Sequence, residues 1–292
     1  MRFTGALSAF LFSVALAAPL MAQTQPGCDP SKGIGVGRTI DIDATGGPWF
    51  GTPYGDPDFL APGEVVLTFD DGPLPHTTRP ILRALAAGCT KATFFVVGQM
   101  AAAHPEIVRE VASQGHTVGT HTWSHANLRR VSAGTMRAQI ESAFAEVEKA
   151  AEGPIAPFFR YPYLSSTPAT VAYLQGRDIA QVSVDIDSLD YRLRNAQRIV
   201  RQVMAQLERR GRGIILMHDI HASTALAVPG LLVRLKEKGY RIVHLRPTTA
   251  VQTQIASATP PKVLRSDQRP RRDIMQTKVQ DGGGWVWKWP FW

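Results

Sequence analysis

Short apolar or β-branched runs alternate with longer amphipathic stretches from Val65 to about residue 245, and this alternation constrains the fold more than any other feature. The candidate strands are Val65–Phe69, Ala92–Val97, Thr117–Gly119, Ala156–Phe159, Ala180–Val184, Gly213–Met217 and Arg241–Val243. Helical patterns lie near Thr78–Ala87, His104–Ser113, Ser132–Glu152, Pro168–Gln175, Ala196–Arg210 and Ser223–Lys238. Repeated strand-then-helix units indicate a parallel sheet with helical crossovers. The sequence therefore predicts an α/β fold, a distorted (β/α) barrel of about seven parallel strands.

The 292 residues divide into four segments by composition. In residues 1–22, Arg2 precedes an apolar stretch, which is typical of a cleaved signal peptide. An uncleaved membrane anchor is the alternative, since ~20 apolar residues can span a bilayer. Residues 23–61 form a Gly/Pro-rich arm for which we expect no regular structure. Residues 62–249 are the predicted folded domain, and residues 250–292 are a basic, Trp-rich tail that we expect to be disordered.

The net charge is concentrated near the carboxyl end of the chain. The whole chain carries a formal charge of +8, but residues 250–292 contain seven basic and three acidic residues. The folded part is therefore only mildly basic, which argues against a nucleic-acid-binding face. Indole rings and positive charge suit contact of the tail with a cell wall or a membrane surface, and a disordered tail without any partner is the alternative.

The signal peptide predicts export to the periplasm or the extracellular space, where disulfides form. Cys28 and Cys89 are the only cysteines. An even number invites a bridge, which would tie the arm to the domain. Two unrelated thiols are the alternative.

Ionisable side chains follow most of the candidate strands. They are Asp70 and Asp71, His121 and His125, Arg160, then Asp185, Asp187 and Asp190, and finally His218 with Asp219. Catalytic residues of α/β barrels sit at the carboxyl ends of strands. We therefore expect these groups to meet at one rim of the barrel.

His121 and His125 are candidate metal ligands. Two imidazoles four residues apart converge on one cation if the segment turns tightly, and a carboxylate from elsewhere completes a site with an open position for water. Thr122 follows His121, where the metalloprotease helix requires Glu, so that class of site is disfavoured. Surface histidines, and a turn or helix cap at Asp70 and Asp71, remain the alternatives at this point.

Five motifs in order resemble the NodB-type polysaccharide deacetylases, a group that includes chitooligosaccharide and peptidoglycan deacetylases. The resemblance runs from about Gly63 to Leu245. The motifs are Thr68-Phe69-Asp70-Asp71-Gly72-Pro73, Ala92–Gly98 with His121-Thr122-Trp123-Ser124-His125, Arg160-Tyr161-Pro162-Tyr163, Asp187-Ser188-Leu189-Asp190-Tyr191, and Ile215-Leu216-Met217-His218-Asp219.

The resemblance implies a role for each matching residue. The metal ligands would be Asp71, His121 and His125, with Asp70 as general base and His218 as general acid. Arg160 would orient Asp70, Asp190 would tune His218, and Asp187 would assist. The remaining matches would contact substrate: Leu216 at the acetyl-methyl pocket, the backbone N–H of Tyr163 at the oxyanion, and Pro162 and Tyr191 on the groove wall.

Amide hydrolysis explains why these residue types occur together. Zn²⁺ lowers the pKa of a bound water toward ~7, and a carboxylate takes the remaining proton. The amine leaves only when protonated, which a histidine held by a carboxylate can do. Two departures from the family pattern lie near the substrate: Leu164 stands where Gly is frequent, and Tyr191 replaces Trp. His116 and His221 occupy neither a ligand nor an acid position, and we interpret them as structural.

The sequence thus predicts an exported, metal-dependent hydrolase that removes N-acetyl groups from an N-acetylglucosamine-containing polysaccharide or oligosaccharide. The resemblance implies one divalent cation, Zn²⁺ first and Co²⁺ or Ni²⁺ as substitutes. The expected partner is the N-acetylated glycan, and we expect a monomer. The alternatives are an O-acetyl esterase acting on a glycan such as acetylxylan, and a wall-binding barrel without activity.

Overall fold

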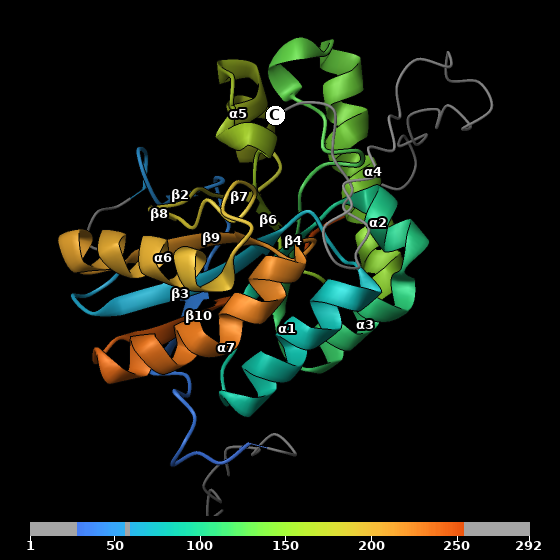
Figure 1. The fold of residues 1–292 in the computed structure, drawn as a ribbon. Helices are drawn as coiled ribbons and strands as arrows, with labels where there is room; N and C mark the ends of the chain where they lie inside the picture. Colours follow the sequence, from blue (N-terminus) through green and yellow to red (C-terminus); the bar gives the residue numbers. More distant parts are fainter. Residues whose placement is uncertain (1–27, 56–58, 254–292) are drawn as a thin grey trace, which may run out of the picture.

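The computed structural model describes residues 28–55 and 59–253, and these form an α/β fold (Figure 1). The strands are β1 (Arg38–Ile42), β2 (Trp49–Phe50), β3 (Glu64–Asp70), β4 (Thr93–Val96), β5 (Thr117–Thr120), β6 (Phe158–Phe159), β7 (Ala180–Val182), β8 (Ile186–Asp187), β9 (Gly213–His218) and β10 (Arg241–Pro247). The helices are α1 (Pro75–Ala87), α2 (Gly98–Ala103), α3 (Pro105–Ser113), α4 (Ala133–Ala151), α5 (Pro168–Gln175), α6 (Ala196–Arg210) and α7 (Ala222–Glu237), with short 3₁₀ turns at Leu128–Arg130 and Pro162–Leu164.

Every ladder between the described strands is parallel, which confirms the predicted sheet with helical crossovers. β3 is the central strand, because it pairs with β9 on one side and with β4 and β10 on the other. From β4 the sheet continues through β5, β6 and β7 to β2, and β8 extends it beyond β9. The sheet curls into a distorted barrel whose register sets Asp70 of β3 opposite His218 of β9.

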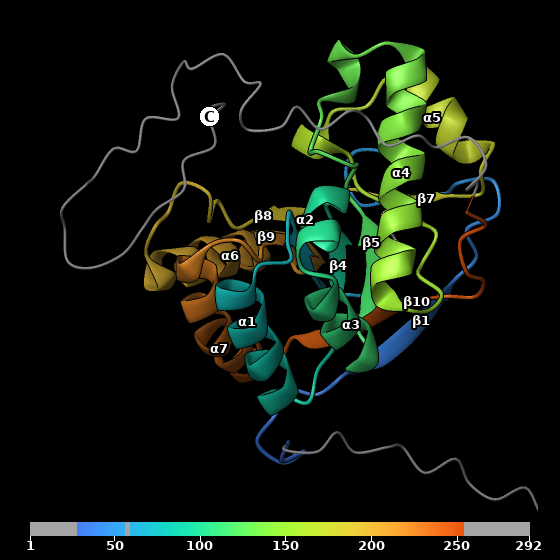
Figure 2. The ribbon, with the colours of Figure 1, turned by 90° about the vertical axis from the view of Figure 1, so that its right-hand side faces the viewer.

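The strands have two buried faces, because the helices cover one side and the other side fills the barrel. Along β3, Val65, Leu67 and Phe69 pack with helix residues, whereas Val66 belongs to the inner cluster with Phe95. Helices α6, α7, α1, α3 and α4 contact one another in that order around the outside. Figure 2 shows α6 and α7 on one flank of the sheet and α4 along β5 on the other. Because successive side chains of a strand point to opposite faces, only every second residue of β3 points into the barrel and can reach the site.

The N-terminal arm differs from the expectation of no regular structure. Residues 38–42 form β1, which pairs with β10, and Trp49–Phe50 form β2, which pairs with β7. Tertiary pairing therefore overrides the turn-rich composition of this segment. At the other end, the Val251 N–H donates to the Ile155 carbonyl at 3.1 Å, so the packed chain continues past the predicted boundary at residue 249.

Two short elements were also absent from the expected pattern. β8 covers only two residues among the aspartates after β7, and α2 is separated from α3, which begins at Pro105, by His104 alone. Proline lacks the N–H that a continuous helix needs, so the two helices cannot merge.

A disulfide joins Cys28 to Cys89, with a Cα–Cα distance of 5.3 Å, and thereby ties the arm to the end of α1. Within residues 28–55 and 59–253, no helix is both long and apolar enough to cross a membrane. The predicted signal peptide and the tail beyond residue 253 lie outside the described residues.

Candidate active site

Asp70 ends β3 and points into the barrel, since it continues the inner row of Val66 and Thr68. Its Oδ1 accepts a hydrogen bond from Arg160 Nη1 at 2.7 Å, and both residues are almost fully buried. Burial raises the pKa of Asp70 to about 6, although the charge of Arg160 opposes this shift. A carboxylate whose pKa lies near neutrality is suited to accept a proton from water.

Arg160 follows β6 and fixes Asp70 in place. Its guanidinium also donates to Thr68 Oγ1 at 2.7 Å, to the Val182 carbonyl at 2.9 Å and to the Ser183 carbonyl at 3.0 Å. The Phe95 ring lies beneath it, with Cζ 4.2 Å from the ring centroid. These contacts hold the guanidinium in one orientation. It therefore presents Nη1 to Asp70 and cannot rotate toward another acceptor.

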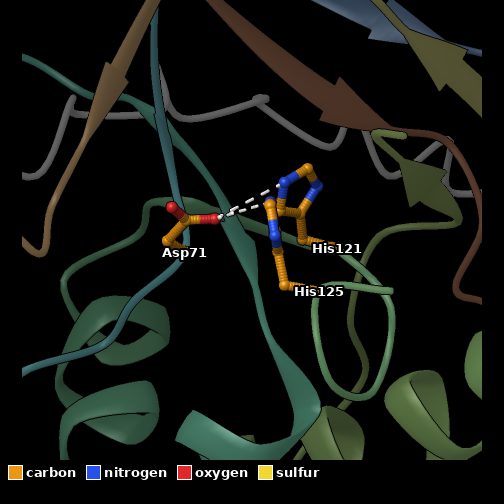
Figure 3. Close-up of side chains that lie close together, drawn as sticks. All are labelled: Asp71, His121 and His125. Atoms are coloured by element: carbon orange, nitrogen blue, oxygen red, sulfur yellow. Dashed lines mark ion pairs between the residues drawn. The ribbon is translucent and has the colours of Figure 1, made fainter. Parts of the chain in front are cut away.

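Asp71, His121 and His125 bring three ligand-type atoms together (Figure 3). Asp71 follows β3, and His121 follows β5. Asp71 and His125 both have positive φ, 79° and 54°, so each sits in a tight turn that aims its side chain at the others. Asp71 Oδ1 lies 3.3 Å from His125 Nε2 and 3.6 Å from His121 Nε2.

The electrostatics of these three residues suit a divalent cation. Burial lowers the pKa of His121 to about 3, and its Nδ1 lies 2.7 Å from the Arg160 carbonyl, to which it must donate. The lone pair of Nε2 therefore faces Asp71. Burial also lowers the pKa of His125. Burial alone would raise the pKa of Asp71, but the attraction of the surrounding histidines in their protonated forms, His125 first and then His218, outweighs it and lowers that pKa.

Asp71 Oδ1 is buried and accepts no hydrogen bond from the described part of the chain. An ionised oxygen without a donor is costly in a protein interior. Of the two imidazole nitrogens beside it, that of His121 offers a lone pair, and that of His125 makes no hydrogen bond to it. One carboxylate and two neutral imidazoles are the donor set of a site that binds Zn²⁺ or a similar cation and leaves a coordination position open. The three residues thus fit the expected metal.

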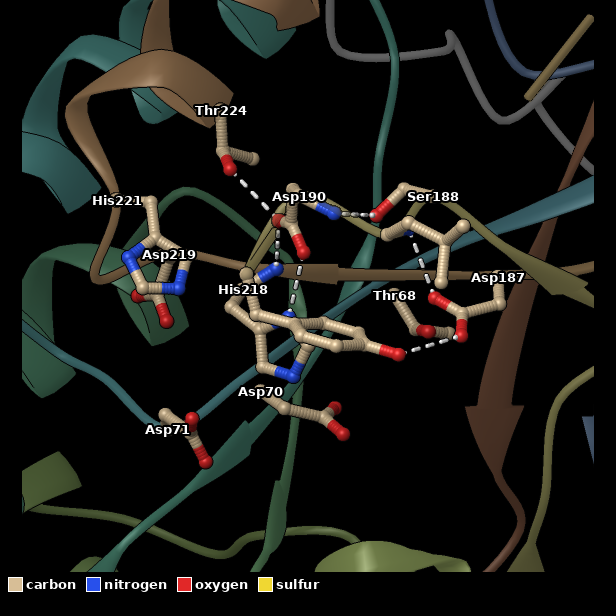
Figure 4. A network of polar contacts seen from close by, with 12 residues as sticks. Thr68, Asp70, Asp71, Asp187, Ser188, Asp190, His218, Asp219, His221 and Thr224 are labelled. Carbon is tan, nitrogen blue, oxygen red and sulfur yellow. Dashed lines mark hydrogen bonds and ion pairs between the residues drawn. The ribbon is translucent and has the colours of Figure 1, made fainter. Parts of the chain in front are cut away.

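His218 ends β9 and forms a buried pair with Asp190 (Figure 4). Its Nδ1 lies 2.7 Å from Asp190 Oδ1, while Asp190 Oδ2 accepts from the His218 backbone N–H at 2.7 Å and from Thr224 Oγ1 at 2.6 Å. Burial would lower the pKa of His218, but Asp190 outweighs it and raises that pKa to about 10. The imidazole therefore carries a proton at neutral pH, and its Nε2 side faces the space shared with Asp70 and Asp71.

Asp187 contacts its own loop and makes no hydrogen bond to His218 in the described residues. Its carboxylate accepts from the Leu189 N–H at 2.9 Å and from the Tyr191 hydroxyl at 3.2 Å. The Tyr191 ring in turn lies edge-on to His218, with centroids 5.7 Å apart. Leu216 lies two residues before His218 on the same inner face of β9, opposite Thr68. These residues surround the acid side of the site.

Tyr163 lies on the metal side, with its ring 4.7 Å from that of His125. It follows the buried Pro162 and has φ of 59°, and Leu164 continues in the left-handed region at 51°. Glycine adopts this region without penalty, so the leucine is held there by the surrounding turn. Tyr163 and Leu164 are both partly exposed at the rim.

Asp219 is a buried site residue to which sequence reasoning assigned no role. Its Oδ1 accepts the Gly72 N–H at 2.9 Å, and its Oδ2 accepts from Thr78 Oγ1 at 2.6 Å. A Cβ on Gly72 would lie 2.1 Å from Oδ2, so glycine is required there. Asp219 thus supports the turn that carries Asp71. The only available signal was its position directly after His218.

Asp185 does not reach the rim, which corrects the expectation that all the aspartates after β7 gather there. After β7 the chain runs to the amino end of β9, where Asp185 Oδ2 accepts a hydrogen bond from the Ile214 N–H at 2.9 Å. Its Oδ1 accepts from the Thr52 hydroxyl at 2.6 Å and lies 3.2 Å from Arg210 Nη2. The unpredicted β8 causes this difference, because its two residues carry Asp187 back toward the site.

Comparison with known proteins identifies the family of the chain. A family model described as polysaccharide deacetylase matches residues 60–182. The peptidoglycan-N-acetylglucosamine deacetylase of Listeria monocytogenes is 35% identical over 184 residues, which are 62% of this chain and 38% of that protein. The chitooligosaccharide deacetylase of Bradyrhizobium sp. is 33% identical over 155 residues, 53% of this chain and 70% of that protein. A solved peptidoglycan deacetylase from Bdellovibrio bacteriovorus matches with a TM-score of 0.68 and 30% identity, over 77% of this chain and 63% of that chain.

The fold is shared with a solved peptidoglycan deacetylase. The chain belongs to the polysaccharide deacetylase family, as its motifs implied. It spans about two fifths of the Listeria relative, 38% of that length.

Proposed function

We propose that this protein is a metal-dependent N-deacetylase of glycans that contain N-acetylglucosamine, such as peptidoglycan or chitooligosaccharide. The observation that carries the proposal is the buried, donor-free Oδ1 of Asp71 between two imidazole nitrogens, 3.3 and 3.6 Å away. Asp70 and the protonated His218 flank it on paired strands. A base and an acid on opposite sides of a cation site are what hydrolysis of an amide requires.

A bound divalent cation, Zn²⁺ in the first place, would make water acidic enough to attack at neutral pH and would polarise the acetyl carbonyl. Asp70, oriented by Arg160, takes the proton of the attacking water. His218 then donates a proton from Nε2 to the leaving amine, and Asp190 stabilises the imidazolium before that transfer. The Tyr163 N–H would meet the charge that develops on the carbonyl oxygen, and Leu216 would contact the acetyl methyl group.

The substrate class follows from the relatives, whose names include peptidoglycan and chitooligosaccharide deacetylases. Both glycans lie outside the cytoplasmic membrane, which agrees with the signal peptide predicted at residues 1–22. We therefore place the enzyme in the periplasm or outside the cell.

The test separates the neighbouring aspartates. Asp71→Asn should lose most of its bound zinc, because a neutral amide oxygen is a poorer ligand than a carboxylate. Asp70→Asn should retain zinc and lose kcat by about 10²–10⁴, the usual contribution of general acid–base catalysis. Asp43→Asn, at an exposed position of the arm, controls for the change of charge and should resemble the wild type.

Zinc content and acetate release from chitooligosaccharide, peptidoglycan and acetylxylan are measured for each protein. Full zinc content and near-wild-type activity in both site variants would show that the aspartates only shape a turn. Acetate from acetylxylan alone would replace the amide assignment with an ester one.

A further inference from the structure

The loop between β8 and α6 places two arginines beside the acid His218. Arg194 Nη1 lies 3.5 Å from His221 Nδ1, and the His221 ring lies 5.9 Å from that of His218 between centroids. Figure 4 shows His221 beside His218 on the side away from Asp187. Arg192 lies over the Tyr191 ring, with Cζ 5.3 Å from the centroid. Only the imidazole of His221 therefore lies between the positive charge of Arg194 and His218, the proposed acid.

Neither arginine is neutralised by the protein. Among the described residues, no carboxylate lies within ion-pair distance of Arg192 or Arg194, and both side chains are exposed. Two other surface arginines, Arg79 and Arg246, are by contrast paired with Glu110 and Asp41. The guanidinium has no acceptor, so His221 Nδ1 must accept its hydrogen bond and cannot cancel its charge.

The opposite rim carries an arginine as well, but its charge is opposed there. Arg130 acts on the hydroxyl of Tyr163, and Asp71 acts on the same hydroxyl more strongly. Of the other carboxylates near the centre, Asp70 and Asp190 are paired with Arg160 and His218, and Asp187 accepts from the Tyr191 hydroxyl. The exposed positive charge beside the site is therefore on the His218 side, at Arg192 and Arg194.

We propose that Arg194, positioned by His221, forms a subsite for a carboxylate carried by the glycan at or next to the sugar that is deacetylated. This inference rests on the proposed function, because it takes the leaving amine to sit at His218. On an amino sugar the neighbouring position is C3, and in muramic acid that position bears a lactyl carboxylate. Chitooligosaccharides carry no carboxylate at all. The subsite therefore selects peptidoglycan-type glycans over chitin-type glycans.

The experiment compares three glycans of four sugars: neutral chitotetraose, a glucosamine–muramic acid tetrasaccharide with free lactyl groups, and the same glycan with stem peptides. Acetate-release kinetics and calorimetric binding are measured for wild type, Arg194→Gln and Arg194→Lys. Arg201→Gln is the control, because it removes one positive charge of the same kind at an exposed position of α6, outside the loop that carries Arg194.

Wild type should bind the carboxylate-bearing glycans more tightly than chitotetraose. Arg194→Gln should raise their KM and Kd about fivefold, with kcat and all chitotetraose constants unchanged. Arg194→Lys should restore most of the binding, Arg201→Gln should have no effect, and the preference should shrink as salt rises. Whichever anionic glycan is preferred identifies the lactyl or the peptide carboxylate as the group bound.

Equal binding of the neutral and anionic glycans by wild type would overturn the proposal. So would an equal loss on all three glycans in Arg194→Gln, which would indicate a structural role for the loop. Because binding is measured separately from acetate release, a protein that binds selectively but releases no acetate would refute the proposed function and leave the subsite standing.

Discussion

Asp190→Asn is the substitution whose outcome follows most directly from the structure. The Asp190 carboxylate accepts three hydrogen bonds, two of them from His218, and it is completely buried. Asparagine has nearly the same shape but only one acceptor oxygen and no charge. The variant therefore removes the partner that holds a proton on the imidazole while the loop keeps its size.

The rise in the pKa of His218 from 6.5 to about 10 bounds the interaction of the imidazolium with its surroundings at roughly 5 kcal/mol. Without the Asp190 charge, the largest contribution that opposes burial is lost and the pKa falls, although the charges of Asp71 and Asp70 still raise it. At pH 8 only about 3% of an imidazole with the ordinary pKa of ~6.5 is protonated, compared with about 90% at pH 5.5. We therefore expect the ratio of variant to wild-type kcat to rise about thirtyfold between pH 8 and pH 5.5.

The free energy of unfolding should also depend on pH through the pKa of His218. A raised pKa of His218 stabilises the folded wild type fully below pH 6.5, and this contribution is lost as the pH rises through about 10. In Asp190→Asn this pH dependence should disappear, with up to two unsatisfied donors costing ~1–3 kcal/mol each.

The assay is kcat for acetate release from pH 5.5 to 8, with urea unfolding in parallel. The imidazolium of His218 lowers the pKa of Asp70, so the loss of its charge lets the pKa of Asp70 rise in the variant, and the thirtyfold change is an upper bound. Thr224→Val, which removes one donor to Asp190 but keeps the charge, should lower kcat less than about fivefold at every pH. A kcat ratio for Asp190→Asn that is constant with pH would refute the reasoning, because the carboxylate would then only support the loop.

Three further outcomes are expected. Asp219→Ala should unfold ~2–4 kcal/mol more easily because Gly72 and Thr78 lose their acceptor, whereas Asp219→Asn should stay within about 1 kcal/mol; equal losses in urea titrations would contradict the proposed support of the turn. Replacing both cysteines of the disulfide by serine should cost up to ~4 kcal/mol by the loop-entropy relation, and an unchanged urea midpoint would show that the arm is held by β1 alone. Ending the chain after Thr253 should leave turnover of soluble chitooligosaccharide within about twofold, and a tenfold loss in folded protein would place residues 254–292 in the active site.

The sequence predicted the strands that are buried on both faces, because runs such as those of β3 and β9 are mostly apolar rather than alternating. It missed β1 and β2. Arg38–Ile42 has only one buried residue, at its end, and gains its strand conformation by pairing with a strand more than 200 residues later. No local pattern can report such a partner.

The residues of the candidate site also divide into those that the sequence could predict and those that it could not. Residues whose role depends on side-chain chemistry, such as His121 and His218, were recognisable as motif members. Asp219 acts on a backbone N–H, and Arg194 acts as a charge that the fold brings beside His218. Such roles depend on three-dimensional position, which a single sequence does not contain. The motif gave Asp190 its proposed partner, and the structure supplies the three contacts that explain the pairing.

The burial of Arg160 limits which residues can replace Asp70. An apolar residue there leaves a guanidinium with no exposed surface without its ion-pair partner, and breaking such a buried pair typically costs ~3–5 kcal/mol. That is a large part of the stability of a domain of this size. Asparagine keeps an acceptor oxygen for Nη1, and the guanidinium retains its bonds to Thr68, Val182 and Ser183. A descendant that no longer needs the base therefore drifts at this position toward residues that still accept from Arg160, because selection for folding alone excludes the others.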